Sequence, residues 1–286
     1  MTGSTFWPRL RWSLALMGGW SVVGFLVLPM LIVVPVSLTD RNYLSLPDHA
    51  LSLQHYRAFF THQLWLQSTL QSLLIASIST MTSVVLGALC AIGCWRLSNG
   101  WSAAVRLLML APLIVPTVIQ GLAMYRLWVV AGLYDTYAGV VLAHTLTGIP
   151  FVLISVSAAL AGFDVKLEQA ARGLGASAVD TIRLVIVPAI APGLVSGGVF
   201  AFIHSFDELV IVLFITSREI STLPKRIWDG LQDRIDPTIA AVSVILIAAT
   251  LLLLAADAWL RRYRAQSRIN AARTLRRTSR DLRGLA

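Results

Sequence analysis

The sequence predicts an all-α membrane protein that crosses the bilayer six times. Its 286 residues are 57% hydrophobic and only 13% charged, with a mean hydropathy of +0.75. Soluble domains carry roughly twice that share of charged residues. Six stretches hold the ~20 apolar residues that a helix needs to cross the hydrocarbon core. They are residues 13–38, 67–94, 107–132, 139–162, 189–216 and 238–260.

The distribution of basic residues predicts the orientation, because Lys and Arg concentrate on the cytoplasmic side. If both termini are cytoplasmic, 16 of the 23 Lys and Arg residues lie inside, six lie outside and Arg126 lies within a span. We therefore expect a cytoplasmic N-terminus at 1–12, a six-helix domain at 13–260 and an Arg-rich cytoplasmic tail at 261–286. The tail suits either contact with anionic lipid or simple solvation. This topology accounts for the net charge of +9, so no nucleic-acid partner is expected.

Neither a metal site nor a catalytic site is predicted. The two cysteines, Cys90 and Cys94, stand four residues apart inside an apolar stretch and are expected to be small buried hydrophobic residues. The chain has no H-E-x-x-H or G-x-S-x-G motif, which argues against a membrane enzyme. It also has no G-x-x-x-x-G-K-[ST] loop for ATP, since its two lysines do not follow glycine.

A polar segment, 163–188, separates the fourth and fifth spans and is expected on the cytoplasmic side. Asp164 is suited to cap the start of a helix there. Glu168 and Arg172 stand four residues apart, in the order that favours an ion pair along a helix. Gly175 can adopt the left-handed conformation that ends such a helix.

A second helix is expected over 178–187, with Pro188 ending it before the membrane begins. The segment would then form a helix, a glycine corner and a second helix. Two interpretations stay open at this point. The segment is either an ordered connector between spans or a compact surface for a partner outside the membrane.

The stretch EQAARGLGASAVDTIRLVIVP, 168–188, resembles the EAA loop of ATP-binding-cassette importer permeases. Aligned on Gly175 and Pro188, the triplet is Gln169, Ala170 and Ala171. The acidic residue that usually opens the triplet is displaced by one place, to Glu168. This departure weakens the ion pair expected at the first position, while the glycine corner and the proline are intact.

The resemblance extends from about 53 to 256. SLQHYRAFF, HSFDELVIVLFIT and STLPKRIWDGL are similar to segments of the spermidine/putrescine branch of these permeases. The resemblance implies a type I importer permease fold in a bacterial inner membrane. It also implies a loop at 163–188 that docks on a cytoplasmic ATPase dimer, a second permease subunit that makes a heterodimer, and a periplasmic substrate-binding protein.

ATP and Mg²⁺ would then be used by the partner ATPase, and this chain would bind no cofactor. Polyamines such as spermidine and putrescine are the expected substrates. Other small amines or opines are an alternative, because their permeases look similar. A secondary transporter is a further alternative, although the chain shows no internal inverted repeat of the kind that many such transporters have.

Two adjacent acids, Asp207 and Glu208, are predicted to lie within the fifth span. Charged residues at membrane depth usually face a cavity or a partner. One hypothesis is a pathway for cations, in which Tyr125 and Trp128 stack on an ammonium group. The other is an ion pair with Arg126. Since one arginine cannot neutralise two acids, we expect one structural acid and one pathway acid, with Asp207 in the pathway.

Overall fold

A computed structural model describes residues 6–97, 99–233, 236–256 and 258–259, and all regular structure within these ranges is helical. The predicted all-α class is confirmed. Residues 62–233 form one compact unit, and the described residues before and after it belong to a second. The predicted tail at 261–286 lies outside the described residues.

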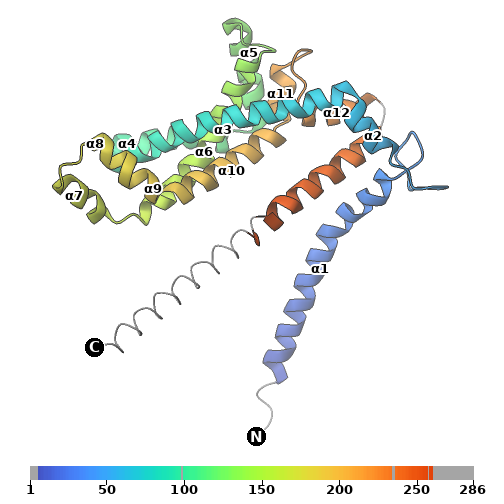
Figure 1. Cartoon of the computed structure of the whole chain (residues 1–286), viewed down its shortest axis with the longest axis horizontal. Coiled ribbons are helices and arrows are strands. Elements are labelled where there is room, and N and C mark those ends of the chain that lie inside the picture. Colours follow the sequence, from blue (N-terminus) through green and yellow to red (C-terminus); the bar gives the residue numbers. More distant parts are fainter. Residues whose placement is uncertain (1–5, 98, 234–235, 257, 260–286) are drawn as a thin grey trace, which may run out of the picture. The chain divides into compact units, whose positions relative to one another are not determined.

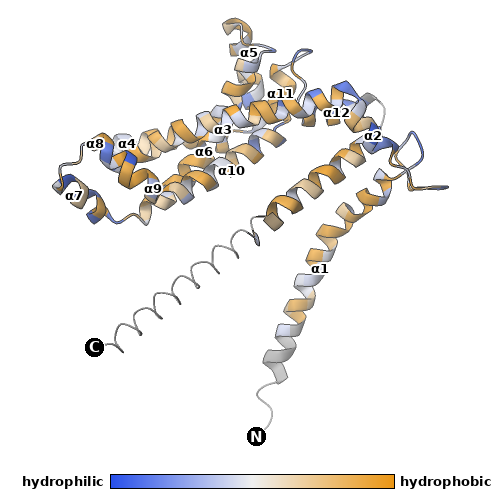
Figure 2. Cartoon of the chain, viewed as in Figure 1, coloured by the Kyte–Doolittle hydropathy of each residue, from blue (hydrophilic) through white to orange (hydrophobic). Residues whose placement is uncertain are grey.

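The predicted spans correspond to helices of the structure. Among the described residues, four helices are long and apolar enough to cross a membrane, and two bent helix pairs raise the number to six if each pair is one span. Hydrophobic residues dominate the long helices (Figure 2). The four unbroken ones are Leu14–Ser37 within α1 (Phe6–Ser37), α3 (Gln63–Leu97), α6 (Tyr137–Ala161) and the helix Thr238–Ala256.

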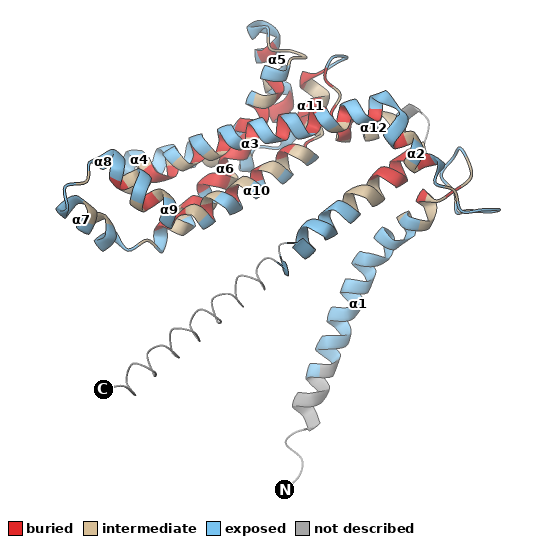
Figure 3. Ribbon diagram, viewed as in Figure 1, coloured by how far each residue is buried: buried red, intermediate tan, exposed pale blue. Residues whose placement is uncertain are grey.

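Helices α3, α6 and α10 (Ala191–Asp207) run side by side and form the core of the 62–233 unit (Figure 1). Helix α6 is the most deeply buried of them (Figure 3). Glycines allow the close approach of α10 to α6. A Cβ added at Gly193 would lie 2.7 Å from the Cβ of Ala159, and one at Gly197 would lie 2.9 Å from the Cα of Val152. The two helices therefore pack nearly backbone to backbone.

The third predicted span, 107–132, is not one straight helix. It consists of α4 (Gly100–Ile114) and α5 (Thr117–Ala131), which meet at an angle of 104°. Pro116 lies at the break and has no N–H to continue the hydrogen-bond ladder. The Gln120 Nε2 donates to the carbonyls of Pro112, at 2.9 Å, and Val115, at 2.7 Å. A side chain thus satisfies the carbonyls that the bend frees, as a membrane interior requires.

The fifth predicted span, 189–216, is interrupted twice. A bend of 70° at Ile190 separates Ala178–Ala189 from α10. A second break, at Glu208 and Leu209, separates α10 from the short α11 (Val210–Ile215). The two predicted membrane acids therefore lie at a helix break rather than in the middle of a continuous helix.

The second unit contains α1, α2 (Gln54–Thr61) and the helix Thr238–Ala256. Large apolar side chains of α1 between Trp12 and Val34 are exposed (Figure 3), which suits a lipid environment. The end of α1 and the segment that follows it are held to α2 by polar contacts. The Ser37 Oγ lies 2.6 Å from the Tyr56 hydroxyl, and the His55 Nε2 lies 3.0 Å from the carbonyl oxygen of Arg41.

Candidate functional site

The polar loop between α6 and α10 begins with α7 (Val165–Gly173), at one end of the 62–233 unit (Figure 1). The Asp164 Oδ1 accepts a hydrogen bond of 2.9 Å from the Lys166 N–H, so the predicted N-cap is confirmed. The helix ends at Gly173, and Gly175, two residues later, has a φ of +89°. The Gly175 N–H donates to the Arg172 carbonyl at 3.0 Å, and the Ala176 N–H donates to the Ala171 carbonyl at 3.1 Å. These two bonds make a Schellman motif around the predicted glycine corner.

The second helix of the loop starts at α8 (Ala178–Thr181), where the Ser177 Oγ accepts from the Asp180 N–H at 3.1 Å. The helix does not end at Pro188, contrary to the prediction. It passes through a π-helical turn, Ile182–Ile186, and α9 (Val187–Ala189), and the bend falls at Ile190. The Val187 N–H, directly before Pro188, bonds five residues back to the Ile182 carbonyl. This π-helical turn accommodates Pro188, which has no N–H of its own.

An ion-pair cluster connects α7 to the end of α3. The predicted Glu168–Arg172 pair is confirmed, with 3.2 Å between Oε1 and Nη2. The same Oε1 also lies 3.0 Å from the Nη2 of Arg96, in the last turn of α3. Sequence spacing gave no signal for this second partner, which is 72 residues away. An open hollow of about 490 Å³ adjoins the cluster, lined by Trp95, Arg96, Val165, Glu168, Gln169 and Arg172.

The loop exposes apolar side chains beside its polar ones. Leu174 is 90% exposed at the glycine corner, and Leu167 and Val179 are also exposed. Gln169 and Ala170 of the triplet are exposed, whereas Ala171 is half-buried. These exposed apolar groups are accessible for contact with another protein.

The two predicted membrane acids have different environments. Asp207, the last residue of α10, is exposed, and its side chain makes no hydrogen bond or ion pair within the described chain. Glu208 is 7% exposed, and its Oε1 accepts a 3.0 Å hydrogen bond from the Ile211 N–H at the start of α11. Its Oε2 lies 3.9 Å from the Nε2 of His204.

The hypothesis of an ion pair with Arg126 is not supported. Arg126 is exposed on α5, and no described acid lies within 4.0 Å of its guanidinium. The hydrogen bond from Ile211 and the nearby His204 occupy Glu208 instead. Of the two acids, Glu208 thus has a hydrogen-bond partner and a neighbouring imidazole, whereas the Asp207 side chain has no hydrogen-bond or ion-pair partner in the described chain.

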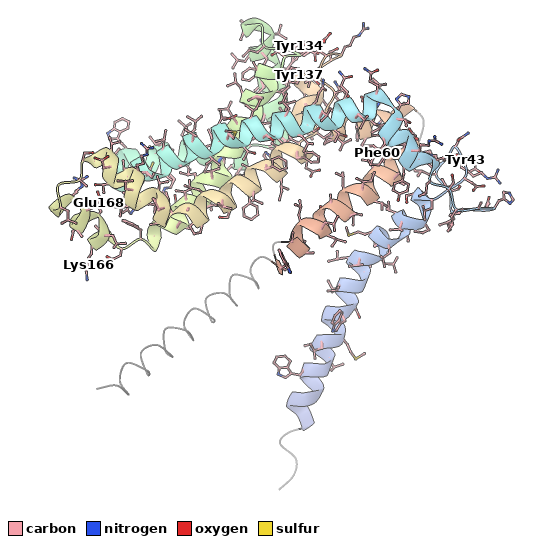
Figure 4. The ribbon with its side chains drawn as sticks, in the orientation of Figure 1. Tyr43, Phe60, Tyr134, Tyr137, Lys166 and Glu168 are labelled. Carbon is pink, nitrogen blue, oxygen red and sulfur yellow. The ribbon has the colours of Figure 1, made fainter. Side chains whose placement is uncertain are left out.

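The two aromatic candidates also differ. Trp128 is buried, and its Nε1 donates to the Gly139 carbonyl at 2.8 Å, which ties α5 to α6. Tyr125 is exposed, and its ring packs edge to face with Tyr134 at 5.6 Å between centroids. Tyr134 and Tyr137 lie close to α5 (Figure 4). Tyr125 is therefore accessible in this conformation, while Trp128 is part of the core.

A buried polar network in the helix core was not predicted. The His144 Nδ1 lies 2.7 Å from the Ser205 Oγ, which is itself 2.9 Å from the Ser79 Oγ. This network joins α6, α10 and α3. Nearby, a cavity of about 290 Å³ lies at the α4–α5 break and is lined by Thr147, His204 and residues 112–117 and 120. In the sequence, His144 is a single histidine within an apolar span, and that alone was not enough to predict the network.

The opposite end of the 62–233 unit carries an ordered loop between α11 and α12 (Leu223–Asp233). Asp135, at φ 56°, accepts hydrogen bonds from four consecutive backbone N–H groups. Burial alone would raise the pKa of Asp135, but these four bonds lower it below its usual value of 3.8. The donors are Ser217, Arg218, Glu219 and Ile220, at 2.9, 2.9, 3.1 and 3.2 Å.

Lys225 binds the carbonyl side of the same loop. Its Nζ donates to the Thr216 Oγ1 and the Ser217 carbonyl, both at 2.8 Å, and to the Ile220 carbonyl at 3.2 Å. Burial lowers the pKa of Lys225, and Asp229 and Asp135 partly oppose that shift. Asp135 therefore binds N–H groups of the loop backbone, and Lys225 binds its carbonyl groups.

The chain is similar to known transport proteins. Residues 83–267 match the family described as "Binding-protein-dependent transport system inner membrane component". The chain is 28% identical over 232 residues to the spermidine/putrescine transport system permease protein PotC of Haemophilus influenzae, covering 81% of this chain and 90% of that protein. It is 30% identical over 236 residues to the trehalose transport system permease protein SugB of Mycobacterium tuberculosis, covering 79% and 85%.

A solved structure of a bacterial alginate transporter, in complex with an alginate pentasaccharide-bound periplasmic protein, contains a chain of similar fold. The TM-score is 0.63 at 17% identity, and the match covers 87% of this chain and 93% of that one. The expected resemblance to importer permeases of the polyamine branch is confirmed by these matches. The family match covers more than half of the chain and includes the glycine corner and the α10–α11 break. This multi-pass membrane protein therefore belongs to the family of inner membrane components of binding-protein-dependent transport systems, as a permease subunit of an ATP-binding-cassette importer rather than an enzyme.

Proposed function

We propose that this chain forms half of the translocation pathway of a polyamine importer and is driven by a cytoplasmic ATPase dimer that docks on the loop 163–188. ATP and Mg²⁺ would be bound by the ATPase. The observation that carries the proposal is the glycine corner at Gly175, which holds Leu174 almost fully exposed at the tip of the loop. A polar loop with an apolar tip is suited to insert into a groove on a soluble partner.

The proposed orientation rests on charge. The excess of Lys and Arg supports cytoplasmic termini and a cytoplasmic loop at 163–188. The ordered loop held by Asp135 and Lys225 lies at the other end of the 62–233 unit and would face the periplasm of a bacterial inner membrane. A periplasmic substrate-binding protein would dock there, since the similar alginate transporter forms a complex with a periplasmic protein. A second permease subunit would complete the pathway as a heterodimer.

Polyamines are the proposed cargo, because the chain is similar to PotC over most of its length and presents the exposed carboxylate of Asp207 at the α10–α11 break. A carboxylate can neutralise an ammonium group at membrane depth. Another small amine or an opine is the alternative. The comparable identity to the trehalose permease SugB makes a direct uptake measurement necessary.

The first experiment is affinity purification of the tagged chain from its native membrane in mild detergent, followed by mass spectrometry. We expect a cytoplasmic ATPase and a second six-span permease to co-purify. The purified complex, reconstituted with its binding protein, should then take up radiolabelled spermidine or putrescine and not trehalose. A chain that purifies alone or only with itself would contradict the proposal and favour a secondary transporter.

The loop is tested by Gly175→Val, with Gly173→Ala as the matched control. Valine at a φ of +89° is strained, at a cost of roughly 1–3 kcal/mol, and would displace the corner that holds Leu174. Gly173 lies in α7, and a Cβ there meets nothing within 4 Å. We expect Gly175→Val to insert normally but to lose the ATPase, whereas Gly173→Ala retains it. Normal ATPase recovery with Gly175→Val would contradict a docking role.

A further inference from the structure

The displaced acid of the triplet points toward this chain's own α3. Residue 169, where the family places its acid, is Gln169 and is exposed, whereas Glu168 has a side chain only 14% exposed. Adjacent residues on a helix diverge by about 100°, so moving the acid by one place turns it from the exposed face of α7 to the inner face. Figure 4 shows Glu168 on the inner side of the loop, while Lys166 extends away from it.

Two arginines share the Glu168 carboxylate, but they differ in what they connect. Arg172 lies on α7 itself and is 50% exposed, so its pair with Glu168 stays within one helix. Arg96 lies in the last turn of α3, is 26% exposed, and is the closer of the two at 3.0 Å. The Arg96–Glu168 pair is therefore a direct polar connection between α7 and a membrane-spanning helix.

We propose that the Arg96–Glu168 ion pair transmits the movement of the docked loop to α3, and that Glu168 does not bind the ATPase. The proposal rests on the docking role proposed above for loop 163–188. Both residues are positioning residues, because they act through α3 and touch neither ATP nor cargo. Helix α3 packs along α6 and α10, so a displacement of its end reaches the helices that carry the polar network and the α10–α11 break. Contiguous contacts of this kind can carry coupling between distant sites.

The partial burial of the pair makes it suitable for this role. Exposed ion pairs are weak and easily screened by salt, whereas a carboxylate removed from water strongly favours keeping its partner. When the loop moves, the attraction between Glu168 and Arg96 opposes their separation, so the end of α3 moves with the loop. The pair on the exposed side, Glu168–Arg172, has no second helix to move.

The test uses the complete complex with its ATPase and binding protein, reconstituted in liposomes, and measures spermidine uptake per ATP hydrolysed. The variants are Arg96→Gln and Glu168→Gln, with Arg172→Gln as the matched control. We expect all three to retain the ATPase on purification. Uptake per ATP should fall about fivefold or more in the first two variants, the lower end of typical coupling between sites. It should change less than twofold in the control.

A charge exchange separates coupling from simple structural loss. Because an arginine at position 168 would repel Arg172, the exchange is made in the Arg172→Gln background, as Arg96→Glu with Glu168→Arg. Each exchange variant alone should lose coupling, and the two together should restore at least half of the uptake per ATP lost in either variant alone. Arg96→Lys should also retain most of the uptake per ATP, since it preserves the charge.

The outcomes distinguish this inference from the proposed function. If the wild-type chain brings no ATPase, the proposed function itself fails. If the wild-type complex assembles and Arg96→Gln couples normally, the ion pair has no role in transmission and this inference is overturned. It is equally overturned if Glu168→Gln releases the ATPase while Arg96→Gln does not, because Glu168 would then be a docking residue.

Discussion

Glu208 and His204 lie one helical turn apart at the end of α10, with 3.9 Å between the carboxylate Oε2 and the imidazole Nε2. The other carboxylate oxygen accepts the Ile211 N–H, which opens α11. Glu208 therefore joins the end of one helix to the start of the next across the break at residue 208. An acid in this position orients the backbone and has little freedom to bind cargo.

Replacement of Glu208 separates its capping role from its charge. Glu208→Gln keeps an oxygen for the Ile211 N–H, so the free energy of unfolding should change by less than about 0.5 kcal/mol. Glu208→Ala removes that acceptor and should cost about 1–2 kcal/mol, as the loss of a helix cap does. Thermal unfolding of the purified complex in detergent checks both. Equal losses in the two variants would show that the charge beside His204, rather than the cap, is what stabilises the break.

Asp207 is expected to affect transport and not assembly, because it is exposed and makes no ion pair within the described chain. Asp207→Asn should raise the KM for spermidine uptake about tenfold, since a charge-assisted contact contributes about 1.5 kcal/mol or more. Arg126→Gln is the control. If Asp207 acted through an ion pair with Arg126, both variants would lose assembled complex alike, and the pathway role would be wrong.

The spermidine uptake assay should also distinguish the roles of the two aromatic candidates, Trp128 and Tyr125. Trp128→Phe keeps an aromatic ring in the core but loses the N–H to the Gly139 carbonyl, so stability should fall by about 1 kcal/mol with an unchanged KM. Tyr125→Leu removes an exposed ring. It should raise the KM about two- to tenfold if the ring stacks on an ammonium group. A raised KM in Trp128→Phe alone would return Trp128 to the pathway.

Local features of the site could be predicted from the sequence because neighbouring residues determine them. Asp164 caps α7, Glu168 pairs with Arg172 and Gly175 takes a positive φ. Each of these depends on residues within four places along the chain. The apolar stretches likewise predicted the four unbroken spans to within a few residues, since the length of a span follows from the thickness of the bilayer.

Features that depend on distant residues could not be predicted. Arg96 reaches Glu168 only because α3 and α7 end near each other, and nothing in the sequence shows that. The break at Pro116 was hidden by an apolar stretch long enough for one span, although Gln120, which donates to the freed carbonyls, is close in sequence. The π-helical turn before Pro188 had no local signal. Arg126 was expected as a partner of the membrane acids because it lies within a span, which says nothing about its direction around the helix.

Asp135 makes the stability of the ordered loop depend on pH. Its folded-state pKa is lowered below the usual 3.8 by four backbone N–H donors acting against burial. An acid with a lowered folded pKa stabilises the fold above its unfolded pKa, and this contribution is lost as the pH falls through the folded value. Asp135→Asn removes the charge and one acceptor oxygen, while asparagine tolerates the positive φ of 56°.

We therefore expect Asp135→Asn to lower the free energy of unfolding by about 1–3 kcal/mol at neutral pH, because loop N–H groups lose their acceptor. The difference between the wild type and the variant should stay constant down to mildly acidic pH. It should then shrink as the pH falls below 3.8. Melting temperatures of both proteins, measured in parallel, remove the contribution of the other titrating acids. Asp164→Asn, which alters an exposed cap at the far end of the same unit, controls for a general loss of carboxylate charge. A difference for Asp135→Asn that persists unchanged in acid would show that the loop is held by its shape and by Lys225, and not by the ionised Asp135.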